Sequence, residues 1–232
     1  MSALWAALPA AGSGSRLGSA APKQFLKLRD RSVLEWSVDV LRRAVSLEGI
    51  VIAVPAEALG RVEATGVLAD ERVHFCAGGA SRAESVIAAL QTLPAAQEDW
   101  VLVHDAARPC VPVADVRTLV EEVTQTGVGG ILAAPVTDTL KRAGEAGRID
   151  TTVERSGLWR AMTPQMFRVG ELLAALHDAK VANAPVTDEA SAMERAGHPV
   201  CLVPGSAANI KITFAEDLPL AEFQLRQQGE IA

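Results

Sequence analysis

The sequence predicts an α/β fold, in which a mostly parallel sheet carries helices on both faces. Short aliphatic runs alternate with longer segments whose apolar residues recur at helical spacing, along most of the chain. The 232 residues are 49% hydrophobic and 22% charged, which is a globular composition. One domain can absorb this length. We therefore expect a single domain over residues 1–232, with one projecting arm.

The first half of the chain shows the alternation most clearly. Residues 3–9 form an apolar run that predicts a buried first strand. A helix with one apolar face is expected from Val33 to Leu47. The β-branched run Ile50–Val54 predicts a strand covered on both faces, and Val73–Cys76 predicts a short strand.

The alternation continues to about residue 134. Ser81 and Glu84 form a capping-box pattern that opens a helix ending near Leu93. The elements expected after it are a buried strand at Trp100–His104, a helix at Val113–Thr126 and a strand at Ile131–Ala134.

The pattern then changes. Two strand-like runs, Thr137–Arg142 and Arg148–Val153, flank a hairpin-like turn at Ala143–Gly147. The segment has few bulky apolar residues, so we expect an arm at about 137–155 that projects from the core and serves as an oligomer contact. The remaining expected elements are helices at Val169–Val181 and Asp188–Ala196, a strand at Val200–Val203 and a last helix from Ala215.

Composition excludes several classes of protein. The net charge of −6 argues against a nucleic-acid or membrane-surface binder. The three cysteines match no metal motif and cannot form a closed disulfide set, which indicates a reducing, cytoplasmic compartment. No basic residue precedes the apolar N-terminus and no apolar run approaches the roughly 20 residues of a membrane span. The absence of tyrosine excludes a mechanism that needs a catalytic one.

A small-residue loop follows the first strand, from Pro9 to Gly18. Such a loop lets backbone N–H groups approach phosphates closely. It lacks the Gly-Lys-Ser/Thr of a P-loop, and Leu17 stands where a dinucleotide-binding loop needs glycine. Arg16 and Lys23 add two positive charges, which suit a triphosphate. The alternative interpretation is a Gly/Ser surface turn.

Three further groups of residues could carry chemistry. Asp105 follows a buried strand, where a carboxylate can hold Mg²⁺ or a hydroxyl; the alternative is an ion pair with Arg108 that closes a turn. His104 fits a core histidine better than a base. Gly78 and Gly79 precede a helix and could present backbone groups to a ring or anion, although the capping box also explains this segment.

The third group consists of polar residues in apolar surroundings. Each is individually more typical of a helix cap or a solvated face, and Thr187 fits an N-cap. Only together do they suggest a second anion site. They are Arg155, Thr163–Gln165, Thr187–Glu189 and Asn209–Lys211.

Nine motifs in order resemble those of one family, the 2-C-methyl-D-erythritol 4-phosphate cytidylyltransferases of the non-mevalonate isoprenoid pathway. The motifs are Pro9–Arg16, Pro22–Phe25, Gly78–Val86, His104–Pro109, Asp138–Lys141, Arg155–Trp159, Thr163–Gln165, Thr187–Ser191 and Asn209–Thr213. The resemblance implies a doubly wound, Rossmann-like nucleotidyltransferase fold, a homodimer joined through the arm, and dependence on Mg²⁺. It implies a reaction of CTP with methylerythritol phosphate that gives 4-diphosphocytidyl-2-C-methyl-D-erythritol and pyrophosphate.

The resemblance also implies roles for individual residues. Arg16 and Lys23 correspond to transition-state stabilisers on the triphosphate, and Arg155 and Lys211 to residues that hold the acceptor phosphate. The CTP contacts are expected from Pro9, Ala10, Ala11, Gly12, Ser13, Gly14, Arg16, Lys23, Gly79, Ala80, Ala83, Ser85, Asp105 and Ala106. The acceptor contacts are expected from Asp105, Arg108, Thr139, Arg155, Thr163, Thr187 and Lys211, with Asp105 also the candidate near the metal.

One departure and three alternatives remain. The family often has an acidic residue where this chain has Ala80, so we expect a reduced contact with the nucleotide there. A cytidylyltransferase of the same fold that uses ribitol 5-phosphate shares the nucleotide half and differs in acceptor residues. A non-catalytic nucleotide-binding regulator has little need for both Arg16 and Lys23. An NAD-dependent reductase conflicts with the missing tyrosine.

Overall fold

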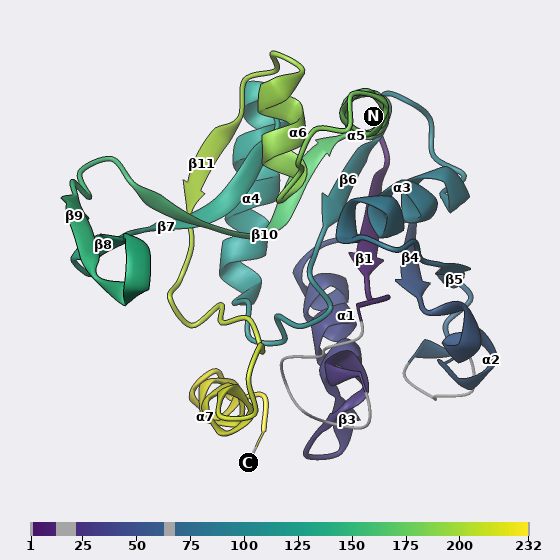
Figure 1. Cartoon of the computed structure of the whole chain (residues 1–232). Helices are drawn as coiled ribbons and strands as arrows, with labels where there is room; N and C mark the ends of the chain where they lie inside the picture. The colour runs from purple at the N-terminus through teal and green to yellow at the C-terminus, as the bar shows by residue number, and fades with distance from the viewer. Residues whose placement is uncertain (1, 13–21, 63–67, 232) are drawn as a thin grey trace.

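A computed structural model describes residues 2–12, 22–62 and 68–231 of the chain. In this part of the chain the main sheet has seven strands (Figure 1). Strand β10 runs antiparallel to both of its neighbours, and the other pairs are parallel, so the mostly parallel sheet is confirmed. In spatial order the strands are β11 (Cys201–Pro204), β7 (Gly130–Pro135), β10 (Trp159–Arg168), β6 (Trp100–Val103), β1 (Leu4–Pro9), β4 (Gly49–Val54) and β5 (Val73–Ala77).

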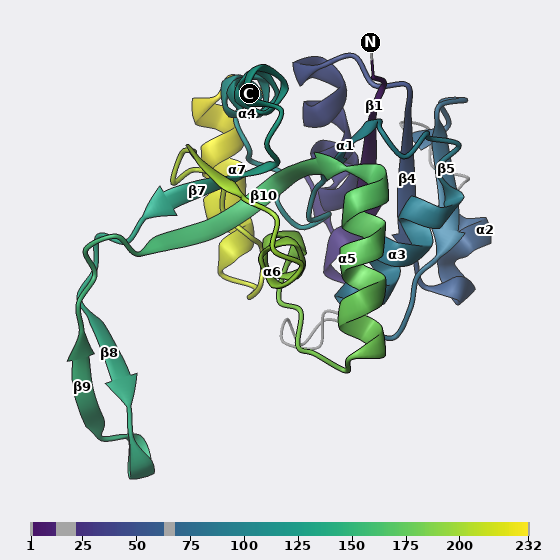
Figure 2. The same cartoon turned by 90° about the horizontal axis from the view of Figure 1, so that it is seen from above.

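Helices cover both faces of this sheet, which confirms the doubly wound α/β class (Figures 1 and 2). One face carries α1 (Val33–Ala44) and α4 (Val113–Thr126). The other carries α3 (Arg82–Thr92), α5 (Val169–Val181) and α6 (Glu189–Arg195). None of the helices in the described ranges is long and apolar enough to cross a membrane.

Strand β4 shows why both faces need cover. Its side chains alternate between the two cores, with Ile50 and Ile52 packing on the α1 side and Val51 and Ala53 on the α3 side. All six of its residues are buried.

The smaller elements are α2 (Leu59–Val62), α7 (Asp217–Gln227), the paired strands β2 (Lys27–Leu28) and β3 (Arg31–Ser32), and 3-10 turns at Lys23–Phe25, Ala56–Ala58 and Glu145–Gly147.

Local signals in the sequence set several helix boundaries. The capping box of Ser81 and Glu84 opens α3 as predicted. A second capping box, of Ser32 and Glu35, opens α1. This helix ends at Ala44, three residues earlier than predicted, because the next residue is already extended (φ −145°, ψ 159°).

The sequence predicts no element at residues 159–168, where the structure has the longest of its described strands, β10. Its sequence contains Pro164, which cannot donate to a sheet ladder and therefore argues against a central strand. The structure accommodates the proline at an irregularity, where the pairing register with β7 shifts between Ala161 and Gln165. Tertiary pairing on both sides overrides the local signal.

The segment predicted as an arm forms a hairpin. Strands β8 (Leu140–Ala143) and β9 (Ile149–Val153) pair antiparallel and project away from the body of the molecule (Figure 2). Nearly all of their side chains are exposed, including Ile149 at 65%. A two-stranded hairpin is only marginally stable by itself, so the arm lacks the packing that would hold it in place within one chain.

Candidate active site

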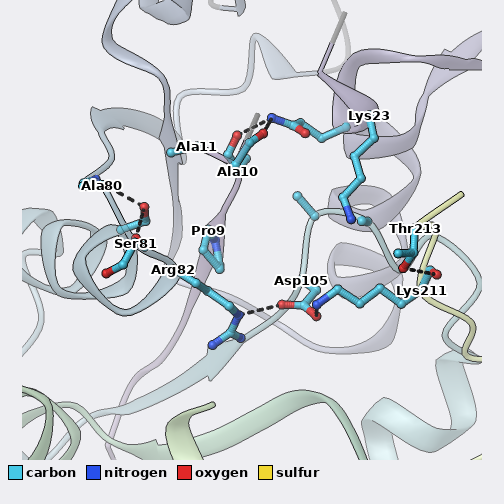
Figure 3. A pocket seen from close by; sticks show the side chains of 16 residues that line it. Pro9, Ala10, Ala11, Lys23, Ala80, Ser81, Arg82, Asp105, Lys211 and Thr213 are labelled. Atoms are coloured by element: carbon cyan, nitrogen blue, oxygen red, sulfur yellow. Dashed lines mark hydrogen bonds and ion pairs between the residues drawn. The ribbon is translucent and has the colours of Figure 1, made fainter. Parts of the chain in front are cut away.

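A pocket of about 520 Å³ lies at the carboxyl ends of β1 and β6. These two strands are neighbours, and the sheet continues from β1 through β4 on one side and from β6 through β10 on the other. Ligands of open α/β sheets bind at such a switch point. Its lining residues are Pro9–Gly12, Lys23, Gln24, Gly79–Arg82, Ser85, Asp105–Ala107, Lys211 and Thr213 (Figure 3).

Two loops meet on one side of the pocket, the loop after β1 and the loop before α3. They meet so closely that a Cβ on Gly78 would lie 2.4 Å from the Cβ of Ala11. The Gly79 N–H donates to Ser85 Oγ over 3.2 Å, which fixes the second loop. Gln24 Nε2 donates to the carbonyls of Ala10 and Gly12 over 2.5 and 3.2 Å, which fixes the first. The pocket therefore has a rigid, narrow wall built largely from backbone.

The opposite wall centres on the Asp105 carboxylate, which three cations surround. Arg82 Nε donates to Oδ1 over 2.9 Å, and Lys211 Nζ lies 2.8 Å from Oδ2 (Figure 3). Arg108 Nε lies 3.4 Å from Oδ2. Burial alone would raise the pKa of Asp105, but the attraction of these three cations outweighs it and lowers the pKa below its usual range. Asp105 is therefore an anion at neutral pH.

A buried hydrogen-bond chain holds Asp105 from behind. Its backbone N–H donates to Thr163 Oγ1 over 3.0 Å, and that hydroxyl lies 3.1 Å from His104 Nδ1. His104 Nε2 lies 3.0 Å from the Arg108 carbonyl, which can only accept. His104 is therefore protonated on Nε2, and Thr163 donates to its Nδ1. Burial lowers the pKa of this imidazole to about 4, so it is neutral at pH 7.

The two lysines of the pocket come from distant segments. Lys23 Nζ donates to the Ile212 carbonyl over 2.8 Å, which brings it beside the segment that carries Lys211. Asn209 Nδ2 fixes that segment by donating to the Thr163 carbonyl over 2.8 Å. The fold thus gathers positive charge around a space that phosphate groups can fill.

The structure brings most of the expected CTP residues together. Ten of the expected CTP residues line the pocket, namely Pro9, Ala10, Ala11, Gly12, Lys23, Gly79, Ala80, Ser85, Asp105 and Ala106. Lys211, an expected acceptor residue, lines it as well. Ala83 does not line it and instead packs against the core under α3. The predictions for Ser13, Gly14 and Arg16 lie outside the described residues.

The expected acceptor residues are more scattered. Arg108 and Thr163 lie behind Asp105, where both are engaged with it. Thr187 is exposed just before α6, and the N-cap of that helix is its neighbour Asp188. Thr139 and Arg155 belong to the arm, and within the described chain no arm residue lines this pocket.

Three residues that shape the site have no individual role predicted from the sequence, although each lies within a motif named there. Gln24 holds the first loop, and Arg82 joins Asp105 to the fully buried Glu189. Arg82 and Glu189 are 107 positions apart. In the sequence, each of these two residues is only a charged residue at the start of a helix, Arg82 in α3 and Glu189 in α6. That they form an ion pair can be seen only in the folded structure.

The described part of the chain offers few ligands to a metal. The described residues contain no cluster of three or more histidine, cysteine or acidic side chains that could hold an ion. Among those lining the pocket, Asp105 supplies the one carboxylate. This fits Mg²⁺ held by a single carboxylate together with substrate phosphates and water, and not a cage made only of protein ligands.

The fold and the site define a class. A doubly wound sheet with a backbone-lined loop, two lysines and one carboxylate at its switch point is the arrangement of an α/β nucleotidyltransferase. A family model described as IspD: 2-C-methyl-D-erythritol 4-phosphate cytidylyltransferase matches residues 4–227. The chain belongs to this family.

Individual relatives agree with the family match. The 2-C-methyl-D-erythritol 4-phosphate cytidylyltransferase of Hahella chejuensis is 47% identical over 229 residues, covering 97% of this chain and 93% of the relative. That of Pseudomonas aeruginosa is 48% identical over 219 residues, covering 93% of each. The crystal structure of the Francisella tularensis enzyme superimposes with a TM-score of 0.83 at 33% identity, over 97% of this chain and all of that one.

Proposed function

We propose that this pocket transfers the cytidylyl group of CTP to 2-C-methyl-D-erythritol 4-phosphate, giving 4-diphosphocytidyl-2-C-methyl-D-erythritol and pyrophosphate for isoprenoid precursor synthesis. The family match over nearly the whole chain supports the substrates and the reaction. The observation that carries the assignment to this pocket is the convergence of Lys23, Lys211 and Asp105 at the switch point. The named relatives favour this acceptor over ribitol 5-phosphate.

The chemistry needs no general base. An oxygen of the acceptor phosphate, already ionised at neutral pH, attacks the α-phosphorus of CTP. The new P–O bond forms as the bond from the α-phosphorus to the bridging oxygen breaks, and pyrophosphate leaves with that electron pair. His104 takes no part in proton transfer, because it is buried, neutral and saturated with hydrogen bonds.

Charge stabilisation and positioning supply the catalysis. Lys23, together with Arg16, neutralises the charge that develops on the triphosphate as pyrophosphate departs. The loops at residues 9–12 and 78–81 hold the nucleotide, and we expect their close approach to admit a pyrimidine ring and exclude a purine. Lys211 binds the acceptor phosphate and aligns it with the α-phosphorus, while Asp105 and Arg108 orient the acceptor.

Asp105 would hold Mg²⁺ together with the triphosphate. A bound Mg²⁺ supplies charge neutralisation on the phosphates during the transfer. Since the carboxylate now faces three cations, a further cation is favoured only when substrate phosphates bring their own negative charge.

A second copy of the chain completes the acceptor site in this proposal. Thr139 and Arg155 lie on the arm, away from the pocket of their own chain, so they can contact the acceptor only if the arm reaches another protomer (Figure 2). The exposure of the arm's side chains supports such an interface. We therefore propose a homodimer joined through the arm.

We also propose a cytoplasmic location. Cys76, Cys110 and Cys201 are all free thiols, which is typical of a reducing compartment. Burial raises the pKa of Cys110 to about 12, so this thiol is inert.

The test is pyrophosphate release with CTP and Mg²⁺, with methylerythritol 4-phosphate and ribitol 5-phosphate offered in parallel. We expect release with the first acceptor only. Release with ribitol 5-phosphate alone would preserve the nucleotide half of the site and refute the acceptor half. Release with neither acceptor would refute the proposed reaction and favour a nucleotide-binding role.

A further inference from the structure

A buried ion pair lies directly behind the Asp105 carboxylate. The Glu189 side chain is 0% exposed, and Arg82 Nη1 and Nη2 donate to its two oxygens over 2.6 and 2.9 Å. The Nε of the same guanidinium donates to Asp105 Oδ1 over 2.9 Å. One planar cation therefore joins two carboxylates, and the two-pronged contact fixes its orientation.

Helix stability does not explain why an arginine stands at position 82. Arg82 is the first residue of α3, where the partial positive charge of the helix N-terminus disfavours a cation. The capping box of Ser81 and Glu84 already satisfies this helix end. What Arg82 does contact is the pair of carboxylates, so its position is explained by joining Asp105 to Glu189.

Glu189 is placed so that it can act only through Arg82. It opens α6, where a carboxylate is favoured, but its full burial is costly without a paired cation. Both of its oxygens bind Arg82. The two terminal nitrogens of Arg82 in turn donate to Glu189, and its Nε donates to Asp105.

The pair connects the two halves of the site. Arg82 directly follows Gly79–Ser81, which line the nucleotide side of the pocket. Glu189 lies two residues after Thr187, which the family resemblance assigns to the acceptor side. Between them, Asp105 has Oδ1 on Arg82 and Oδ2 facing Lys211 (Figure 3).

We propose that Glu189 and Arg82 are positioning residues for the transfer reaction. Glu189 holds Arg82, and Arg82 holds the Asp105 carboxylate in the orientation that directs Oδ2 toward Lys211 and the acceptor. Neither residue exchanges a proton or contacts a reacting atom. The inference rests on the proposed function of this pocket and adds to it residues that act from outside the substrate contacts.

The first test is Glu189→Gln, which keeps the size of the side chain but replaces one acceptor oxygen with a donor that repels Arg82. We expect the acceptor KM to rise about tenfold and kcat to fall by a similar factor, because small misplacements in a site are costly. The KM for CTP should change less than about twofold, since the capping box and Ser85 hold the nucleotide loop independently. The matched control is Glu194→Gln, the same change at an exposed position of the same helix.

A double-mutant cycle separates positioning from general damage. If Glu189 acts through Arg82, adding Glu189→Gln to Arg82→Gln should lower kcat/KM for the acceptor by less than about twofold further. If the double variant instead loses the product of the two single-variant losses in kcat/KM, the two residues act independently and the proposal is overturned. A folded Glu189→Gln protein with normal acceptor KM and kcat would overturn it as well. Should the single variant not fold, the double variant replaces the ion pair with two neutral amides, and the same split between acceptor and CTP constants is expected of it.

The wild-type protein keeps the two proposals distinguishable. If it releases pyrophosphate from CTP and methylerythritol phosphate while Glu189→Gln is normal, the positioning proposal fails alone. If the wild type releases none, the proposed function fails, and the positioning proposal falls with it.

Discussion

His104 shows how a single buried group makes the stability of the protein depend on pH. Its imidazole is enclosed by the Thr163 hydroxyl and the Arg108 carbonyl, with Asp105, Arg108 and Arg82 as the charged neighbours. Burial lowers its pKa from 6.5 to about 4. Between these two values the unfolded chain binds a proton that the folded chain does not, so stability falls as the pH falls.

We therefore expect the free energy of unfolding to decrease by roughly 3 kcal/mol as the pH drops from about 6.5 to about 4, at about 1.4 kcal/mol per pKa unit. The His104→Gln variant should lose less over the same range. Asp105 adds its own loss only below the usual carboxyl pKa of about 4. Urea unfolding of the metal-free protein at pH 7 to 4.5 measures the difference, with exposed His74→Gln as the control. Equal slopes for wild type and His104→Gln would contradict the assignment.

Lys211 is the lysine that we expect to bind the acceptor phosphate. Its ammonium group pairs with Asp105 over 2.8 Å. We expect Lys211→Ala to raise the acceptor KM about 10- to 100-fold, because a charge-assisted hydrogen bond to phosphate is lost. The KM for CTP should change much less. Steady-state kinetics with each substrate varied in turn will check this, and equal losses for both would refute the division into two subsites.

Helices and strands could be predicted from the sequence where a local sequence pattern determines them. The Ser81–Glu84 box and the β-branched run at 50–54 named their elements correctly, because capping and double-sided burial leave a local trace. Strand β10 has no such local pattern, because Pro164 argues against a strand. It forms because it pairs with β6 and β7, which come from other parts of the chain. The pairing of Arg82 with Glu189 was likewise invisible before the fold joined two helix starts.

The arm carries the sharpest prediction at this scale. At acceptor concentrations near the wild-type KM, copies with Arg155→Ala and copies with Lys211→Ala should each be nearly inactive alone. If the arm serves the partner's pocket, randomly mixed dimers restore about a quarter of the sites, each built from one intact body and one intact arm. Co-expression of differently tagged copies, followed by the pyrophosphate assay, measures the recovery. Activity no higher than that of the two single variants would contradict the shared site, and a monomer in light scattering would refute the dimer.

At the scale of the whole molecule, the order of the strands decides where chemistry can occur. The chain leaves β1 for one side of the sheet and returns to the other side for β6, which opens a space between their carboxyl ends. The loop after β1, the Asp105 turn and the segment with Lys211 meet there. The sequence indicated each of these pieces separately, but their shared location follows only from the topology.

The whole arrangement serves one purpose in this account, which is to stabilise charge on a triphosphate without a general base. Lys23 tests that claim most directly, because it lines the pocket and is tied to the Lys211 segment. The measurement is turnover of Lys23→Ala with CTP and methylerythritol phosphate, beside Lys27→Ala, a lysine whose side chain is 65% exposed. We predict a folded Lys23→Ala protein that loses at least about 100-fold in kcat, with Lys27→Ala normal. A folded Lys23→Ala protein with near-normal turnover would contradict the account.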